Sequence, residues 1–233
     1  MKSLEENKAK LNSAAEKAST EAEEAKSEVK NFAEKARDIF EESKKAHAAA
    51  VSDIVKSAVD TEGTLFVELA ASDKEAQEIK NGFVSIDVET TGIDAKSNDI
   101  TAIAAVKYID GIKVDAFYTD IKPSDVEESN DPDIKDALDK FFDFLKHDGK
   151  TLPIVTHFSR FAMNFLKRKS EENKIPVKAS YFDICKLSKI IDPELEDRKL
   201  NTLSAHYKIE GHDSNDAVSD AAAVGEIFLK MTE

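Results

Sequence analysis

Two acidic side chains, Asp87 and Glu89, stand at the end of an apolar run that begins at Phe83. Apolar residues alternate with other residues from 84 to 88, a pattern that predicts a buried strand. Successive side chains of a strand point to opposite faces, so residues two apart leave the same face. Two carboxylates this close repel each other unless a cation lies between them, and oxygen ligands suit a divalent metal. The spacing therefore predicts a metal site, with a solvated acidic turn as the alternative.

The string DVETTG, from Asp87 to Gly92, resembles the first motif of the DEDD family of 3′–5′ exonucleases. These enzymes have a ribonuclease-H-like fold, and they include the proofreading epsilon subunit of bacterial DNA polymerase III. Similarity continues in 100–108, 199–203 and 220–223, so that it covers residues 82–231. The resemblance implies two-metal phosphodiester hydrolysis with Mg²⁺ or Mn²⁺ at the 3′ end of single-stranded DNA or RNA.

In the His-type branch of this family, four acids and one histidine perform the chemistry. The resemblance implies that the first metal is held by Asp87, Glu89 and Asp220. It also implies that the terminal nucleotide is contacted by Thr90, Thr91 and Phe161.

Two positions that carry catalytic groups in the family are substituted in this chain. The family's third motif usually reads HNxxFDxxFL, whereas residues 157–166 read HFSRFAMNFL, with Phe158 at the Asn position and Ala162 at the acid position. The family's base is a histidine five residues before the last acid, and Asn215 stands there. Alanine cannot hold a metal and asparagine cannot accept a proton at a useful pH. These losses predict low or lost activity, the state of a pseudoenzyme.

His212 is the histidine nearest to the missing base. It lies eight residues before Asp220, so an altered loop is needed to bring it to the site. It is a candidate substitute base, although we favour the interpretation that it is an ordinary exposed loop histidine. Asp216, four residues before Asp220, is expected to be a first-turn acid favoured by the helix dipole.

The elements expected to position these residues form an α/β domain. Strands come first in hairpins and then alternate with helices, an order typical of a mixed sheet flanked by helices. Asp110-Gly111 predicts the turn of one hairpin. The expected strands are 83–88, 100–109, 112–121, 152–156 and a short one near 181; the expected helices are 134–146, 160–172, 184–190, 200–207 and 215–231.

The chain divides by pattern into a helical extension at 1–60, a linker at 61–81 and the exonuclease-like domain at 82–233. Small or apolar residues recur every three or four positions within 3–59, as in a heptad seam. The seam consists mostly of alanine and buries little area per heptad. Coiled-coil partnering or self-association through 3–59 and a solvated single helix therefore remain alternatives.

The composition of the chain limits the compartment and the kinds of partner expected for it. One cysteine among 233 residues excludes an intramolecular disulfide framework and suits a reducing compartment. The start shows no secretory signal and the chain has no long apolar run, so we expect a cytoplasmic protein with no membrane span. The net charge is −14, of which −12 belongs to residues 61–233, with 34 acidic and 22 basic side chains. This charge disfavours tight nonspecific binding to a duplex.

Two other functions compete with weak exonuclease activity. The first is a catalytically inactive adaptor that binds proteins through the helical extension, which the acidic charge and the seam favour. The second is a nucleic-acid binder that does not cleave, which the charge disfavours. A steep dependence of oligonucleotide binding on salt would favour the binder.

Overall fold

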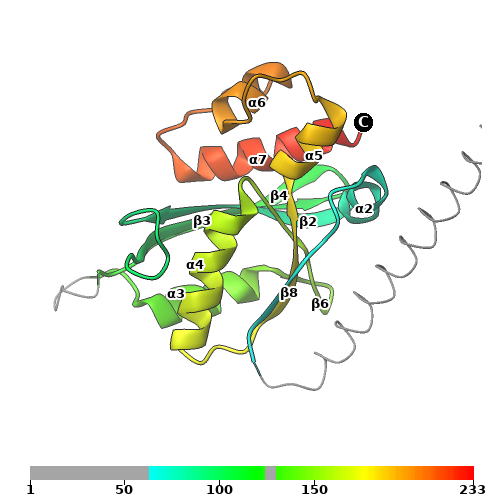
Figure 1. The fold of residues 1–233 in the computed structure, drawn as a ribbon. Helices are drawn as coiled ribbons and strands as arrows, with labels where there is room; N and C mark the ends of the chain where they lie inside the picture. The colour runs from blue at the N-terminus through cyan, green and yellow to red at the C-terminus, as the bar shows by residue number, and fades with distance from the viewer. Residues whose placement is uncertain (1–62, 124–129) are drawn as a thin grey trace, which may run out of the picture. The chain divides into compact units, whose positions relative to one another are not determined.

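The computed structural model describes residues 63–123 and 130–233, and these contain one six-stranded sheet with helices on both faces (Figure 1). The sheet order is β1-β8-β7-β2-β3-β4, and a two-stranded ribbon, β5-β6, lies apart from it. The strands are β1 (Leu65–Glu68), β2 (Gly82–Thr90), β3 (Ile100–Ile109), β4 (Ile112–Asp120), β5 (Lys146–His147), β6 (Lys150–Thr151), β7 (Ile154–Thr156) and β8 (Lys178–Asp183). The helices are α2 (Asp73–Ile79), α3 (Ile134–Phe144), α4 (Ser159–Glu172), α5 (Ile184–Ile191), α6 (Leu200–His206) and α7 (Ala217–Met231).

The antiparallel half of the sheet is the meander β2-β3-β4. Asp110 and Gly111 both have positive φ, 51° and 74°, as the short turn between β3 and β4 requires. The register places Asp87 opposite Ala104 and Glu89 opposite Ala102. Small side chains on β3 therefore lie beside both acids of β2.

The parallel half of the sheet consists of β7, β8 and β1, and β7 also pairs in parallel with β2. The carboxyl ends of β2, β7 and β8 consequently meet at one edge. That edge carries the acid pair of β2, the turn from β7 into α4, and Asp183 at the end of β8. Ends of parallel strands are where an α/β sheet commonly binds ligands.

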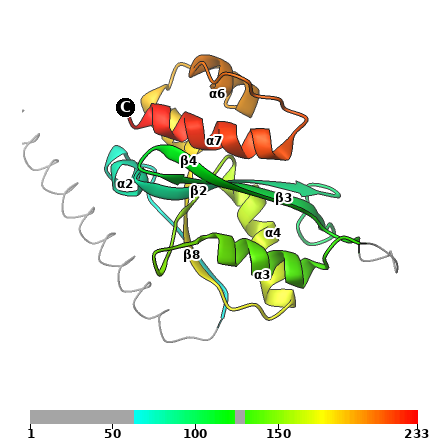
Figure 2. The same ribbon diagram turned by 180° about the vertical axis from the view of Figure 1, so that it is seen from behind.

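Two helical layers cover the sheet. Figures 1 and 2 show α5, α6 and α7 on one face and α3 and α4 on the other. Each face has its own buried apolar cluster: Phe83 of β2 packs with Phe228 of α7 in one, and Ile103 of β3 and Phe141 of α3 belong to the other. A Cβ on Gly225 of α7 would lie 2.3 Å from Tyr108 Cε2, so glycine is what allows the helix to approach the sheet this closely.

The fold class predicted from the sequence, a mixed sheet flanked by helices, is confirmed. Residues 61–81 differ from the expected linker, because they include β1 and α2. Strand β1 pairs with β8 as the edge of the sheet, and Gln77 Nε2 of α2 donates to the carbonyl of Thr232, 2.8 Å away. The compact unit accordingly begins at residue 61 rather than 82. The predicted helical extension lies outside the described residues.

Candidate active site

The two acids of β2 lie on the face of the sheet that α7 covers. Asp87 and Glu89 share this face with Phe83, which packs under α7. Asp87 is partly buried and Glu89 is exposed. The strand thus holds one carboxylate in the protein and presents the other to solvent.

Asp220 brings a third carboxylate from the first turn of α7. Asp216 is the N-cap of this helix rather than the first-turn acid predicted, and its side chain accepts a hydrogen bond from Val218 N at 2.9 Å. Burial raises the pKa of Asp87 to about 7, and the negative charges of Glu89 and Asp220 add to the rise. The three acids that the sequence singled out therefore lie near enough for the charges of Glu89 and Asp220 to act on Asp87.

His212 lies inside this site. Its Nε2 is 2.6 Å from Asp220 Oδ1, and its side chain is only 7% exposed. The interpretation of His212 as an exposed loop histidine is therefore wrong. Gly211, at φ 72°, turns the chain before it, and Asp213 N donates to Ser219 Oγ at 2.8 Å, which folds the loop back onto α7.

Asn215, at the family's base position, is exposed, and its Nδ2 lies 3.2 Å from Asp213 Oδ1. Ala162, at the family's acid position, lies in α4, is 3% exposed and belongs to the buried cluster on the other face. Phe161 also packs against that cluster, with its ring 5.1 Å from the ring of Phe165. These positions add no ionisable group to the site.

Thr90 and Thr91 shape the turn that follows the acids. Thr90 Oγ1 donates to the carbonyl of Gly92 at 2.7 Å, and Thr91 Oγ1 accepts from Asp99 N at 3.0 Å. A Cβ on Gly92 would lie 2.5 Å from Asn98 Oδ1, so a larger residue here would displace the Asn98 side chain. The two hydroxyls hold the turn in the described structure, and their predicted contact with a nucleotide stays a prediction.

The turn from β7 into α4 is held by residues that the sequence analysis did not identify. Ser159 N and Oγ donate to Asp183 Oδ2 at 3.0 and 2.7 Å, and His157 Nε2 lies 2.6 Å from the carbonyl of Arg198. Burial lowers the pKa of His157, while that carbonyl and the charges of Asp183 and Asp220 oppose the shift. Asp183 ends a strand parallel to β2, and that position was the available signal in the sequence.

A second pair was also missed, on β4. Tyr118 Oη donates to Asp120 Oδ1 at 2.6 Å, and this bond is the main cause that raises the pKa of Tyr118 to about 12. The register aligns Asp120 with Ala102 and hence with Glu89. Asp120 is thus a further acid on the same face, two strands away from β2.

The donor set fits one divalent cation by its chemistry. Three carboxylates offer hard oxygen ligands. Burial is the main cause of the raised pKa of Asp87, and the negative charges of Glu89 and Asp220, which a cation would offset, add to it. Within residues 63–123 and 130–233, no three His, Cys, Asp or Glu side chains are already arranged to hold a metal ion. Ala162 offers no carboxylate at the position where the family's third acid would stand. The residues present accordingly suit one ion better than two.

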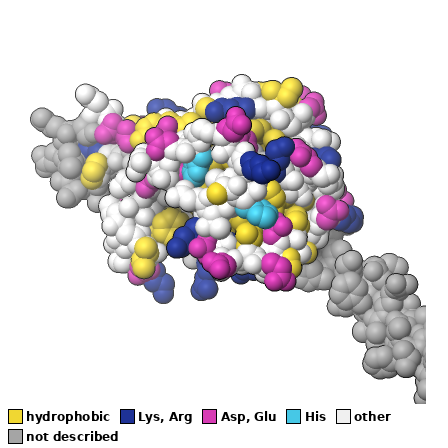
Figure 3. All heavy atoms as spheres, turned by 90° about the horizontal axis from the view of Figure 1, so that it is seen from above, with side chains coloured by type: hydrophobic (Ala, Val, Ile, Leu, Met, Phe, Trp, Pro, Cys, Tyr) yellow, Lys and Arg dark blue, Asp and Glu magenta, His cyan; other side chains and the backbone are white. Residues whose placement is uncertain are grey.

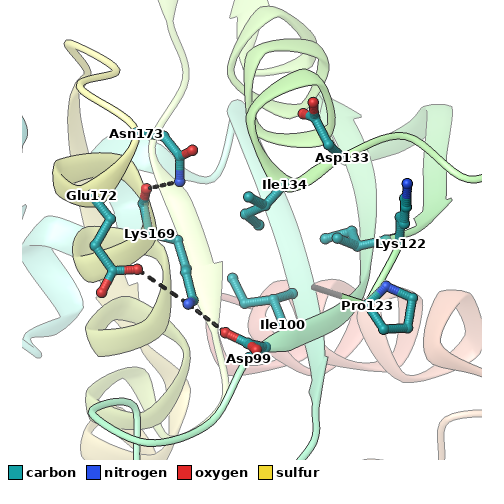
Figure 4. Close-up of a pocket in the computed structure, with 10 residues that line it drawn as sticks. Asp99, Ile100, Lys122, Pro123, Asp133, Ile134, Lys169, Glu172 and Asn173 are labelled. Carbon is teal, nitrogen blue, oxygen red and sulfur yellow. Dashed lines mark hydrogen bonds and ion pairs between the residues drawn. The ribbon is translucent and has the colours of Figure 1, made fainter. Parts of the chain in front are cut away.

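A cavity of about 530 Å³ lies elsewhere, between α4, the start of β3 and the start of α3 (Figure 4). Lys169 crosses its wall and pairs with Asp99 and with Glu172. None of the candidate-site acids Asp87, Glu89, Asp120, Asp183 and Asp220 lines this cavity. The cavity is therefore distinct from the candidate site.

A family model described as Exonuclease (RNase_T) matches residues 118–228, from β4 through α7. A DNA polymerase III of PolC type from Caldanaerobacter subterraneus subsp. tengcongensis is 31% identical over 181 residues, which cover 72% of this chain and 13% of that protein. The chain belongs to the DEDD family of 3′–5′ exonucleases.

Other comparisons agree. The PolC-type polymerase of Bacillus subtilis is 30% identical over 164 residues, covering 64% of this chain and 11% of that protein. The chain thus spans less than a seventh of the length of these curated relatives. Exonuclease I of E. coli, solved with a dT13 oligonucleotide, superposes with a TM-score of 0.52 at 16% identity, over 62% of this chain and 39% of that one. Exonuclease I of Methylocaldum szegediense gives 0.51 at 13% identity, over 64% and 40%. These structures confirm the predicted ribonuclease-H-like fold.

Among the described residues, no helix is both long enough and apolar enough to cross a membrane.

Proposed function

We propose that this chain is a slow, metal-dependent 3′–5′ exonuclease domain that acts on single-stranded DNA. The observation that carries the proposal is the meeting of Asp87, Glu89 and Asp220 at one sheet edge, with His212 Nε2 2.6 Å from Asp220 Oδ1. Carboxylates for a cation and an imidazole beside them are the groups that phosphodiester hydrolysis needs.

Single-stranded DNA is the substrate that the comparisons favour. The curated relatives are named as DNA polymerases III, and the superposed E. coli exonuclease I holds a dT13 oligonucleotide. RNA is the alternative substrate. The site would act on a 3′ end because the family's chemistry has that direction.

Asp87, Glu89 and Asp220 would hold Mg²⁺ or Mn²⁺. When bound, the cation supplies charge stabilisation at the phosphate and lowers the pKa of a coordinated water. Asp87 must ionise to act as a ligand, and its raised pKa of about 7 means that cation binding competes with a proton at neutral pH.

His212 is the substitute base in this proposal. Asp220 orients its ring through the 2.6 Å contact, and the low exposure of the side chain keeps it in place. His212 would accept a proton from the attacking water, the task that Asn215 cannot perform. The missing acid at Ala162 and the displaced base are the reasons for expecting slow turnover.

The test is turnover of a labelled single-stranded oligonucleotide with Mn²⁺, with Asp87→Ala as the blank and His212→Gln as the probe of the base. We expect turnover that disappears in Asp87→Ala and falls by about 10²-fold or more in His212→Gln. The loss should appear in kcat, with KM within about twofold, because a base acts in the chemical step. A folded wild-type protein with no turnover above the blank would overturn the proposal.

A nucleic-acid binder that does not cleave is the second candidate. Buried Ala162 and the lack of a preformed three-ligand group in the described residues favour it. Oligonucleotide binding without turnover would select this candidate. Absence of both binding and turnover would select an adaptor acting through residues 3–59, which lie outside the described part of the chain.

A further inference from the structure

Phe158 has an unusual combination of backbone conformation and exposure. It lies between β7 and α4 in the left-handed region, with φ 51° and ψ 60°, and it is 51% exposed. The other described non-glycine residues with positive φ are aspartates and lysines at hairpin turns or helix ends: Asp110, Asp148, Lys174 and Lys208. A left-handed conformation is unfavourable for a bulky residue and persists where its surroundings impose it, often at functional sites.

The surroundings of Phe158 impose this conformation. Ser159 is fixed by two hydrogen bonds to the buried carboxylate of Asp183, and Phe161 N donates to the carbonyl of Phe158 at 2.9 Å. The turn is rigid, but the Phe158 ring itself projects toward solvent. Because a half-exposed ring gains little from burial, packing alone does not explain a phenylalanine here.

Phe158 directly follows His157, the residue that continues β7 toward the level of Asp87. β7 is parallel to β2, with Thr156 level with Ile86, so the next residues, His157 and Asp87, lie at the same level. Neighbouring strands are separated by roughly 4.8 Å. The Phe158 ring meets the ring of His157 edge to face at 4.4 Å, and His157 responds electrostatically to Asp220.

We propose that Phe158 is a stacking platform for a nucleobase at the 3′ end of a single strand whose phosphate meets the cation that the carboxylates would hold. This inference rests on the proposed function and adds to it a residue that binds the base by stacking. A rigid, half-exposed ring one strand away from the acids can cover the face of any base, because every base has a π-face.

The negative net charge of the domain favours a source of affinity that does not depend on charge. Residues 61–233 carry a net charge of −12, and on the face that bears α5, α6 and α7 the basic side chains are interspersed with acidic ones (Figure 3). Attraction to phosphates is therefore a weak source of affinity. Stacking does not depend on charge, so an acidic domain can use it to hold a single strand.

The test is fluorescence anisotropy of the full chain with a labelled single-stranded DNA, with Ca²⁺ in place of Mn²⁺ to prevent cleavage. A second probe lacks the bases of its two 3′-terminal nucleotides. We expect Phe158→Ala to raise the Kd for the intact probe by about 5- to 150-fold, the loss of one stacked base. The same variant should leave the Kd for the abasic probe unchanged, while Phe158→Tyr should bind as the wild type does.

Two controls exclude a general effect of losing an exposed apolar side chain. Ile112→Ala removes a side chain that is 65% exposed at the opposite end of the sheet, and it should not change either Kd. Phe158→Asn should weaken binding but raise the Tm by about 2–4 °C, because asparagine tolerates the left-handed region. A lower Tm in both Phe158→Ala and Phe158→Asn would show that Phe158 has a structural role instead, and it would overturn the proposal.

Equal Kd values for wild type and Phe158→Ala on the intact probe would overturn the platform, as would equal losses on both probes or no binding by the wild type. Turnover that depends on Asp87, found together with an unaffected Kd in Phe158→Ala, would leave the proposed function standing without the platform. If the wild type shows no turnover but Phe158→Ala weakens binding to the intact probe alone, the platform stands and the protein is a binder that does not cleave.

Discussion

At the scale of single residues, the candidate site is defined by how Asp87 is situated. Its carboxyl is partly buried and faces the charges of two other acids, so ionisation costs more in the folded chain than in the unfolded one. The pKa rises from 3.8 to about 7. The raised pKa of Asp87 therefore has no effect on the stability of the metal-free protein below about pH 4. It lowers that stability as the pH rises from 4 to 7, and the stability stays lowered above that range.

Replacing this carboxyl by a neutral group should stabilise the metal-free protein. We expect Asp87→Asn to match the wild type in Tm near pH 4 and to exceed it at pH 8, with an upper limit of about 4 kcal/mol for a shift of three pKa units. Glu89→Gln, which removes one neighbouring charge, should give a smaller gain. Thermal denaturation across pH in EDTA measures this effect.

The same measurement with Mn²⁺ reports on the metal. Wild-type protein should gain Tm with Mn²⁺ at pH 8 more than at pH 6, because a proton competes for Asp87 at the lower pH. Asp87→Asn should lose most of this gain. A Tm that is the same for wild type and Asp87→Asn at every pH would contradict the electrostatic account.

The contrast between His212 and Asn215 shows what spacing alone can predict. Residues on one element, such as Asp87 and Glu89, keep their relation whatever the rest of the chain does, so the sequence predicted that pair correctly. His212 reaches Asp220 through a loop whose path depends on a left-handed Gly211 and on the bond from Asp213 N to Ser219 Oγ. Counting residues back from Asp220 cannot reveal such a path.

At the scale of elements, α4 determines whether a fourth ligand can be supplied. Ala162 in its first turns is buried, so Ala162→Asp would place a carboxylate in an apolar environment. We expect this variant to lose about 1–3 kcal/mol of stability in EDTA. If the new carboxylate reaches the acids of β2 and completes a two-metal site, Mn²⁺ should recover the loss and turnover should rise at least tenfold.

Ala162→Asn is the matched control for this variant. It has the same shape but no charge, so it should destabilise the fold without a response to Mn²⁺. Destabilisation of Ala162→Asp that Mn²⁺ does not relieve would mean that α4 no longer directs this position toward the acids.

Helix α7 determines where Asp220 stands. Gly225 lets the helix lie against Tyr108 and Ser85, since a Cβ there would come within 2.3 and 2.8 Å of their side chains. We expect Gly225→Ala to lower stability by about 1–3 kcal/mol through overpacking. The displaced helix should also reduce turnover. Thermal denaturation and the oligonucleotide assay measure both effects.

Gly63→Ala is the control, because no atom lies within 4 Å of the added Cβ. Unchanged stability and turnover in Gly225→Ala would contradict the view that this contact sets the position of the helix.

Most elements could be predicted from the sequence because their periodicity is local. The strands β2, β3 and β4 and the helices α3, α4 and α7 lie within a few residues of their expected bounds. β1 and α2 were missed for the opposite reason. The segment Leu65–Glu68 becomes a strand only because β8 offers it a parallel edge, and that partner lies more than a hundred residues away.

At the scale of the whole molecule, charge constrains how the domain can hold DNA. Residues 61–233 carry a net charge of −12, and several basic side chains are committed to ion pairs, among them Arg168 with Glu172, Lys169 with Asp99, and Lys186 with Glu68. These pairs partly neutralise the basic side chains they involve, and acidic side chains outnumber basic ones by 34 to 22 in residues 61–233. If the domain binds DNA as proposed, most of its affinity would come from the cation that the carboxylates would hold and from stacking on Phe158.

The salt dependence of binding tests this balance. For single strands, log Kobs falls with log salt with a slope of about −0.7 for each phosphate neutralised. We expect a shallow slope, between zero and about −1.5, which corresponds to at most two phosphate contacts. Titrations of a labelled oligonucleotide from low to moderate NaCl, with Ca²⁺ held constant, measure the slope. Phe158→Ala should lower the affinity at every salt concentration without changing the slope, because stacking releases no counterions. A slope steeper than about −3 would contradict this account and would mean that a basic surface of the chain binds the phosphates.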